Sequence, residues 1–161
     1  MLSAAVLLAS AALVMALPAA ASDATSTKSV TILVYVEEVT QSIKDVPPKT
    51  FALTHVYTKG DTIRGMETLR NAVRQFNMPK GARVGSDRYV ITAVAWQKVR
   101  VDFVTRLPGG TVHAHGEGKP GVKPVVPVIG GSGLYAGATG SIEGKHLANG
   151  KKLNIYRLRI P

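Results

Sequence analysis

The chain has 161 residues, of which 45% are hydrophobic, which is typical of one folded domain and excludes a disordered chain. It contains no cysteine, which excludes disulfide bonds, thiolate nucleophiles and cysteine-ligated zinc or iron–sulfur sites. The formal net charge is +10 at pH 7, but the basic residues are dispersed along the chain. We interpret this charge as a solvated surface with weak attraction to anionic cell-surface polymers, and expect no nucleic-acid partner.

An uncharged segment opens the chain. Leu2–Leu17 is rich in Ala, Val and Leu, and it is followed by Pro18 and three alanines, the small-residue pattern of a signal-peptidase site. We therefore predict a signal peptide over residues 1–21, a secreted or periplasmic protein, a flexible leader over residues 22–29 and no membrane span after cleavage. An uncleaved anchor is the alternative, because the apolar stretch is close to the lower length limit for a transmembrane helix.

Short alternating and β-branched segments predict strands over most of the remaining chain. Val30–Thr40 and Phe51–Thr58 are the first two, and Gly118–Pro127 is predicted as a loop because it is rich in Gly, Pro and Lys. The later predicted strands are Arg88–Trp96, Lys98–Leu107, Thr111–Gly116, Ser141–Lys145 and Lys152–Ile160. Successive short antiparallel strands indicate an all-β barrel or sandwich.

One segment departs from the alternating pattern. Between Asp61 and Pro79 the apolar residues recur at helical spacing, and Asp61 or Thr62 is a suitable N-cap. The spacing predicts one short helix that packs through an apolar stripe, formed by Ile63, Met66, Leu69, Val73 and Phe76.

A glycine-rich segment, Ile129–Gly140, reads IGGSGLYAGATG. It lacks the Gly-Lys-Ser/Thr ending of a phosphate-binding loop, and no helical pattern follows it. The glycines allow positive φ angles and close backbone approach, and Tyr135 is the large side chain that can fill the space they leave. We interpret the segment as a structural motif, centred on Gly130, Gly131, Ser132, Gly133 and Gly140.

This motif resembles that of the allene oxide cyclase and dirigent barrel superfamily. The matching residues are Gly130, Gly131, Ser132, Gly133, Tyr135, Ala138 and Gly140, and Ser132 with Gly137-Ala138 is more similar to the cyclase branch. Weaker similarities follow in order at Val34–Val39, Gly81–Asp87 and Leu107–Gly116.

The resemblance implies an antiparallel eight-stranded barrel over residues 30–161, with the short helix as an insertion, and a homo-oligomer, usually a trimer. It further implies a secreted barrel that binds a small apolar metabolite and steers a stereocontrolled cyclisation or coupling, an isomerase- or cyclase-type activity without a cofactor. Leu134 and Thr139 stand where dirigent proteins often carry Asp and Arg, so the familiar quinone-methide chemistry is not expected. A non-catalytic barrel that binds a hydrophobic ligand or the cell surface is the alternative.

Glu37 and Glu38 are the candidate catalytic residues. Alignment with the dirigent pattern places Glu38 at that family's pocket Asp, whereas the register of the cyclase pattern leaves both open. Adjacent strand residues point to opposite faces, so at most one of the two lies inside a barrel, where a carboxylate in apolar surroundings could act as an acid or base. Alternatively, both lie at a solvated strand end.

Aromatic side chains are the candidate substrate-binding residues, with core packing as the alternative for each. These residues are Tyr35, Tyr57, Tyr89, Tyr135 and Phe103. His113 and His115 share one strand face, but no third ligand is evident beside them, so we expect no metal site.

Overall fold

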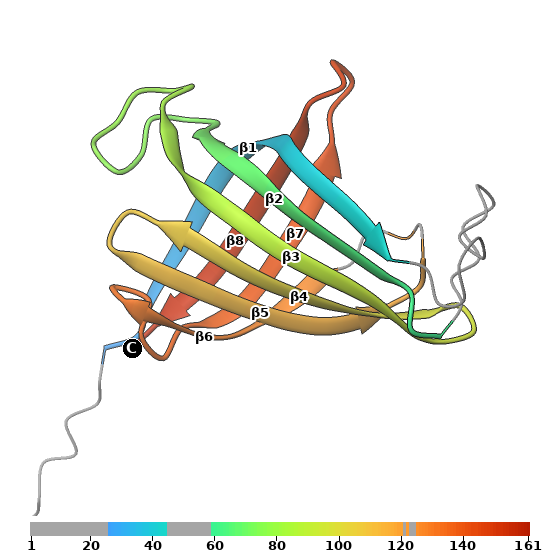
Figure 1. Cartoon of the computed structure of the whole chain (residues 1–161). Helices are drawn as coiled ribbons and strands as arrows, with labels where there is room; N and C mark the ends of the chain where they lie inside the picture. The colour runs from blue at the N-terminus through green and yellow to red at the C-terminus, as the bar shows by residue number, and fades with distance from the viewer. Residues whose placement is uncertain (1–25, 45–58, 121, 123–124) are drawn as a thin grey trace, which may run out of the picture.

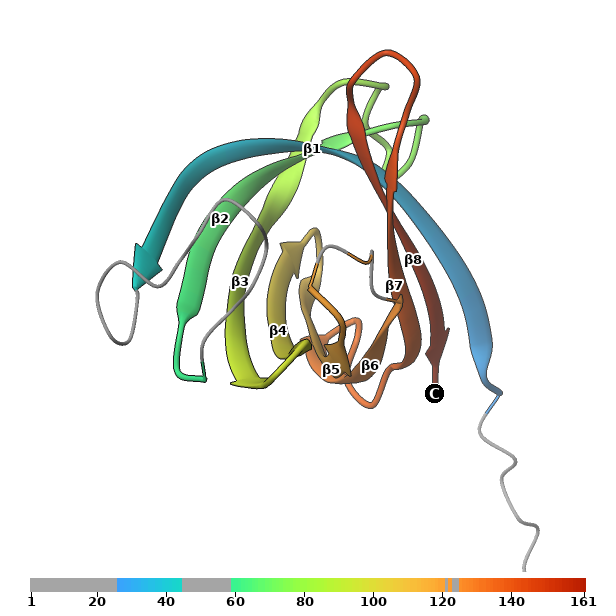
Figure 2. The same ribbon diagram turned by 90° about the vertical axis from the view of Figure 1, so that its right-hand side faces the viewer.

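The computed structural model describes residues 26–44, 59–120, 122 and 125–161, without the side chains of residues 38 and 39. Eight antiparallel strands follow one another around a closed barrel, in which the last strand pairs with the first. Figure 1 shows the barrel from the side, and the turned view in Figure 2 shows the ring of strands. The strands are β1 (Lys28–Lys44), β2 (Thr62–Asn71), β3 (Arg83–Ala95), β4 (Lys98–Leu107), β5 (Gly110–Gly118), β6 (Val125–Gly133), β7 (Thr139–His146) and β8 (Lys152–Ile160).

The predicted all-β antiparallel eight-stranded barrel is thus confirmed, and its wall follows from period-two alternation. In β4, for example, Val99, Val101 and Leu107 are buried, whereas Arg100 and Arg106 are exposed. The same alternation in the other strands gives one apolar core. Across the described ranges, no helix has the length and apolar character needed to cross a membrane.

The prediction of a helix between Asp61 and Pro79 is wrong, because Thr62–Asn71 forms strand β2. The inward positions of β2 alternate as a strand requires, but three of them carry Gly65, Glu67 and Asn71 rather than apolar side chains. The apolar residues of this segment therefore do not alternate along the sequence, and the exposed Met66 adds an apolar residue that completes a helical spacing.

The predicted loop over Gly118–Pro127 is also partly wrong, because β6 begins at Val125 and includes the first glycines of the motif. Pro127 lies where β6 pairs with β7 alone, and the pairing with β5 begins at Val128. A strand tolerates proline at such a position because no ladder bond to its nitrogen is required there. The predicted strand Phe51–Thr58 and the predicted signal peptide lie outside the described residues.

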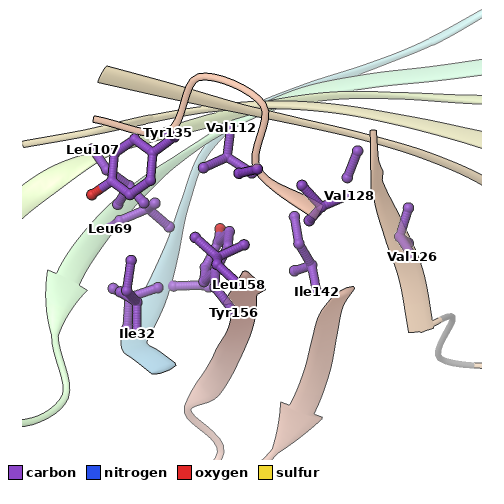
Figure 3. Packing of buried hydrophobic residues seen from close by; sticks show 14 of the residues in the cluster. Ile32, Leu69, Leu107, Val112, Val126, Val128, Tyr135, Ile142, Tyr156 and Leu158 are labelled. Atoms are coloured by element: carbon purple, nitrogen blue, oxygen red, sulfur yellow. The ribbon is translucent and has the colours of Figure 1, made fainter. Parts of the chain in front are cut away.

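The two ends of the barrel differ. The connections β2–β3, β4–β5 and β6–β7 lie at one end, together with the start of β1 and the end of β8. At this closed end Tyr135 packs next to Leu107 and Leu69 (Figure 3). The connections β3–β4 and β7–β8 lie at the other end, which we call the cavity end.

Strand β1 joins the two sides of the barrel. Its residues 28–36 pair with β8 and its residues 34–44 with β2, so β2 does not accompany the first part of β1. There the Gln75 side chain takes the place of a neighbouring strand: its amide nitrogen donates to the Leu33 carbonyl oxygen at 2.7 Å, and its oxygen accepts from the Leu33 nitrogen at 3.3 Å. The buried Asn71 amide donates to three carbonyl oxygens of the same connection, those of Gln75, Met78 and Pro79.

Candidate functional site

Two adjoining cavities lie inside the barrel at the cavity end, with volumes of about 290 Å³ and 120 Å³. Sites for small molecules are usually about 300–1,000 Å³, so the larger cavity is at the lower end of this range and suits only a small organic molecule. The four residues that line both cavities are Phe103, His146, Lys152 and Asn154.

One wall of the larger cavity is apolar. Tyr89 and Phe103, opposite each other on β3 and β4, have ring centroids 6.0 Å apart and tilted by 51°. The Tyr89 ring lies over Gly65, where a side chain of any size would overlap the ring. Val36 and Ile91 complete this wall. The absence of a side chain at Gly65 is therefore what positions Tyr89 against the cavity.

Two charged side chains line the larger cavity from the strands on either side of β1. Glu67 faces inward from β2 and is only 7% exposed, and its Oε1 lies 3.8 Å from Nζ of Lys152 on β8. Lys152 is half-buried and reaches the same cavity from the other side of β1, which separates the two strands. A carboxylate inside a barrel requires such a cationic or hydrogen-bonding environment to remain charged.

A buried polar network lies beneath the cavities. Asp87 has no exposed surface. The Tyr156 hydroxyl donates to its carboxyl group, and the hydroxyl oxygen lies 2.8 Å from Oδ2 and 3.1 Å from Oδ1. The Asn154 amide donates to one of these oxygens at 3.1 Å, and Thr105 Oγ1 lies 3.4 Å from the Tyr156 hydroxyl oxygen. Because Asn154 lines both cavities, it links this network to them.

Burial controls the protonation of this network. It raises the pKa of Asp87 from 3.8 to about 6, although hydrogen bonds from Thr105, Tyr156 and Asn154 oppose the shift. Burial and the nearby Asp87 also raise the pKa of Tyr156 well above its usual value, so its hydroxyl remains a hydrogen-bond donor. Near neutral pH, Asp87 is the group in this network that can gain or lose a proton.

Two carboxyl groups are therefore brought together inside the barrel. Glu67 and Asp87 are direct partners in the pairing of β2 with β3, and both are buried. Glu67 lines the cavity, whereas Asp87 lies behind Asn154 and Tyr156. The arrangement can place one acid–base group against a ligand and support it with a second one that titrates close to neutrality.

The structure separates the residues predicted from the sequence. Tyr89 and Phe103 line the cavity. Tyr135 lies at the closed end, where its hydroxyl donates to the Pro108 carbonyl oxygen at 3.1 Å. Tyr35 is half-buried beneath Lys151, whose Nζ lies 5.1 Å from the ring centroid. Tyr57 lies outside the described residues.

Glu37 does not meet the expectation of an interior carboxylate. It follows the inward-facing Val36 and lies on the outer surface, where its Oε2 accepts from Arg70 Nε at 3.0 Å. Its position is explained by strand alternation, which sends neighbouring side chains to opposite faces. The side chain of Glu38 lies outside the described residues.

The glycine motif closes the barrel at the closed end. Gly133 has a φ of 60°, and a side chain there would overlap the Gly109 carbonyl oxygen. Gly140 has a φ of 131°, and a side chain there would overlap the Arg157 carbonyl oxygen. Ser132 is exposed, and its hydroxyl lies 2.7 Å from that of Thr111. Gly130 and Gly131 complete the same strand.

The strand histidines lie on the outer surface. His115 Nδ1 is 2.6 Å from Asp102 Oδ1, and His113 Nε2 is 3.3 Å from Thr111 Oγ1. Within the described ranges, no three His, Asp or Glu side chains come close enough together to hold a metal ion.

Several residues of the site were missed in the sequence. Glu67 lies in the segment whose spacing predicts a helix, and Asp87 ends the segment Gly81–Asp87, which carries only a weak family similarity. Asn154 and Tyr156 belong to a correctly predicted strand, and their inward direction was not considered. Polar residues at inward positions of a barrel strand were the signal that could have identified them.

Comparisons with known proteins show the fold. No protein-family profile and no curated protein matches the chain. Among solved structures, a pyocyanin demethylase is similar with 18% identity and a TM-score of 0.62, covering 80% of this chain and 99% of its own. An exo-specific intermolecular Diels-Alderase, AbnU, has 15% identity and a TM-score of 0.62, covering 83% and 98%.

A pterocarpan synthase dirigent protein, GePTS1, has 16% identity and a TM-score of 0.57, covering 83% of this chain and 90% of its own. The chain therefore has the barrel fold shared by dirigent proteins and cyclase barrels. The named activities of these three proteins differ, so the fold alone does not specify a reaction.

Proposed function

We propose that this barrel binds a small, mostly apolar organic molecule in its interior cavity and steers a stereocontrolled cyclisation or coupling of it. The observation that carries the proposal is the combination of an aromatic wall, Tyr89 and Phe103, with the inward carboxyl group of Glu67 in one cavity of about 290 Å³. The fold similarity to a Diels-Alderase and a dirigent protein supports the same class of reaction.

The cavity contributes mainly geometry. An interior site holds one conformer of a flexible substrate and excludes water, and both effects favour one ring closure or one coupling face over the others. Tyr89 and Phe103 bind the apolar part of the molecule. Lys152 and Asn154 offer hydrogen-bond donors to a carbonyl or hydroxyl oxygen in the same cavity.

Glu67 is the residue proposed to exchange a proton with the substrate, since it lines the cavity. Asp87 and Tyr156 act as positioning residues, because they hold Asn154 rather than line the cavity themselves. A positioned acid or base contributes roughly 10²–10⁴-fold to such a step.

The experiment begins with the ligand. An extract of cellular metabolites is passed over the immobilised protein, and retained compounds are identified by mass spectrometry. Each is then incubated with the wild type, with Glu67→Gln and with Glu37→Gln, and the products are separated by chiral chromatography. Glu37→Gln is the matched control, because it removes the same charge from an outer glutamate that also contacts a cation.

The expected result is a retained apolar compound that the wild type and Glu37→Gln convert with one stereochemical outcome. Glu67→Gln should retain the compound and convert it roughly 10²-fold more slowly or more. Equal conversion by all three proteins would contradict the role of Glu67, and retention of no compound would contradict the cavity as a binding site.

A non-catalytic binding barrel is the second candidate. One observation favours it: Asp87, whose pKa lies near neutrality, is held by Tyr156 and Asn154 and does not line the cavity. In that case the wild type retains the compound and returns it unchanged.

Export, trimeric assembly and the closer similarity to the cyclase branch stay predictions. Export rests on residues 1–21, and the trimer rests on the family resemblance. N-terminal sequencing of the protein recovered outside the cytoplasm tests the first, and light scattering after size-exclusion chromatography tests the second.

A further inference from the structure

Four basic residues form a row across the outer surface of β1 to β4, strands that lie side by side in Figure 1. Lys44 on β1 is opposite Thr62 on β2, and Arg64 is two residues after Thr62 on that strand. Arg64 is opposite Val90 on β3, and Arg88 is two residues before Val90. Arg88 is in turn opposite Val104, two residues from Arg106. We call Lys44, Arg64, Arg88 and Arg106 the basic diagonal.

The spacing of the basic diagonal follows from strand geometry. Each member is the diagonal cross-strand neighbour of the next, and such neighbours are about 7–8 Å apart. All four side chains are exposed. The result is a line of positive charges at regular intervals on the outside of the barrel, separate from the interior cavity.

The surface along this line is hollowed. Arg64 and Arg88 line a depression of about 390 Å³, and Arg88 and Arg106 line an adjoining one of about 100 Å³. Met66 lines both and is 40% exposed. The larger depression also offers the hydroxyl groups of Thr40 and Ser42, which are opposite the outward-facing Met66 and Arg64.

The basic diagonal has no acidic partner in the described part of the chain, where no carboxylate lies within ion-pair distance of its members. The carboxylates that remain at the described surface are occupied: they pair as Glu37 with Arg70, Asp102 with His115, Glu117 with Lys98 and Glu143 with Arg157. Asp102 is opposite Val90 and is therefore a diagonal cross-strand neighbour of Arg88, but its carboxylate pairs with His115. A second copy of this surface would therefore offer few free carboxylates.

We propose that the basic diagonal is a binding site for a linear acidic polysaccharide that carries sulfate or carboxylate groups along its chain. Guanidinium groups bind such oxyanions with paired hydrogen bonds, and a row of them engages several groups of one polymer. The hydroxyl side chains of Thr40 and Ser42 in the larger depression can exchange hydrogen bonds with sugar hydroxyls. A single-stranded nucleic acid fits less well, because no aromatic side chain among the described lining residues offers a stacking surface.

The test measures binding of a fluorescent heparin-derived oligosaccharide by anisotropy at low and high salt. The variant is Arg64→Gln/Arg88→Gln/Arg106→Gln. The matched control is Arg74→Gln/Lys80→Gln/Arg159→Gln, which removes the same number of exposed positive charges away from the basic diagonal. Thermal unfolding verifies that both variants are folded.

The diagonal variant should bind the oligosaccharide about tenfold more weakly, because it lacks three of the four cations of the row, whereas the control should change by less than about twofold. Binding should also weaken with added salt, because exposed charges are screened. Equal losses in both variants would overturn the proposal in favour of net charge alone. Tighter binding of oligodeoxythymidylate, or equal binding of an uncharged dextran, would overturn it in favour of another partner.

Discussion

At the closed end, the inward side chains Leu69, Leu107 and Tyr135 fill the barrel, whereas at the cavity end Tyr89, Phe103 and Glu67 line an open cavity. The strands and their alternation are the same at both ends. The difference lies in what the inward positions carry: side chains of the apolar core cluster at the closed end, and the charged side chains of Glu67 and Lys152 together with Gly65 at the cavity end. Packing at one end thus allows the other to contain a cavity.

The largest expected effect contrasts the two ends directly. Leu69→Ala removes a fully buried side chain at the closed end and should lower the free energy of unfolding by about 2–5 kcal/mol. Ile91→Ala, in the cavity wall, should lower it by about half as much or less, because its neighbours already face empty space. Urea denaturation measures both, and equal losses would contradict the difference in packing.

The second prediction concerns Asp87, between the two ends. Its pKa is raised by burial from 3.8 to about 6, so the folded protein holds a proton there that the unfolded chain releases. The stabilisation from that proton is complete below pH 4 and is lost as pH rises through about 6. The total loss is about 3 kcal/mol, since one pKa unit corresponds to about 1.4 kcal/mol.

Asp87→Asn removes this dependence, because the side chain no longer ionises. The difference in unfolding free energy between the wild type and Asp87→Asn, measured in urea from pH 4 to pH 8, should therefore move in favour of the variant as pH rises. A constant difference across this range would show that Asp87 does not titrate as its burial implies.

The smallest expected effect concerns Tyr135. Tyr135→Phe removes the hydrogen bond to the Pro108 carbonyl oxygen and should cost about 0.5–1.5 kcal/mol of stability. It should leave ligand retention unchanged, because Tyr135 lies at the closed end. Chemical denaturation and the retention assay measure the two effects, and loss of retention would place Tyr135 in the binding site after all.

The barrel was predictable where each strand alternates cleanly. Lys98–Leu107 has polar and apolar residues in alternation except at Val104 and Thr105, and its predicted bounds are those that the structure has. The sequence of strand β2 predicts a helix because its inward positions include Gly65 and Glu67 in place of apolar residues. The reasons for these two residues lie in contacts with other strands, which a single sequence does not reveal. Gly65 is required by the Tyr89 ring on the next strand, a contact that exists only once the strands pair.

The candidate site was predictable only in part, for the same reason. Tyr89 and Phe103 were found because aromatic residues in strands stand out. Glu67, Asp87 and Asn154 come together from three strands, and their association depends on register and closure. Glu37 was chosen from the local sequence, and strand alternation places it outside.

The Gln75 side chain has a consequence for how the protein behaves in concentrated solution. A strand whose backbone groups face outward unpaired is a template for pairing with another molecule, and natural sheets guard against this. At Leu33, the Gln75 side chain binds the backbone donor and acceptor, and the carbonyl oxygen also accepts from the Ala72 backbone nitrogen at 3.0 Å. Resistance to intermolecular sheet extension at this seam therefore depends on the connection between β2 and β3, which lies at the closed end and has no part in the chemistry of the cavity.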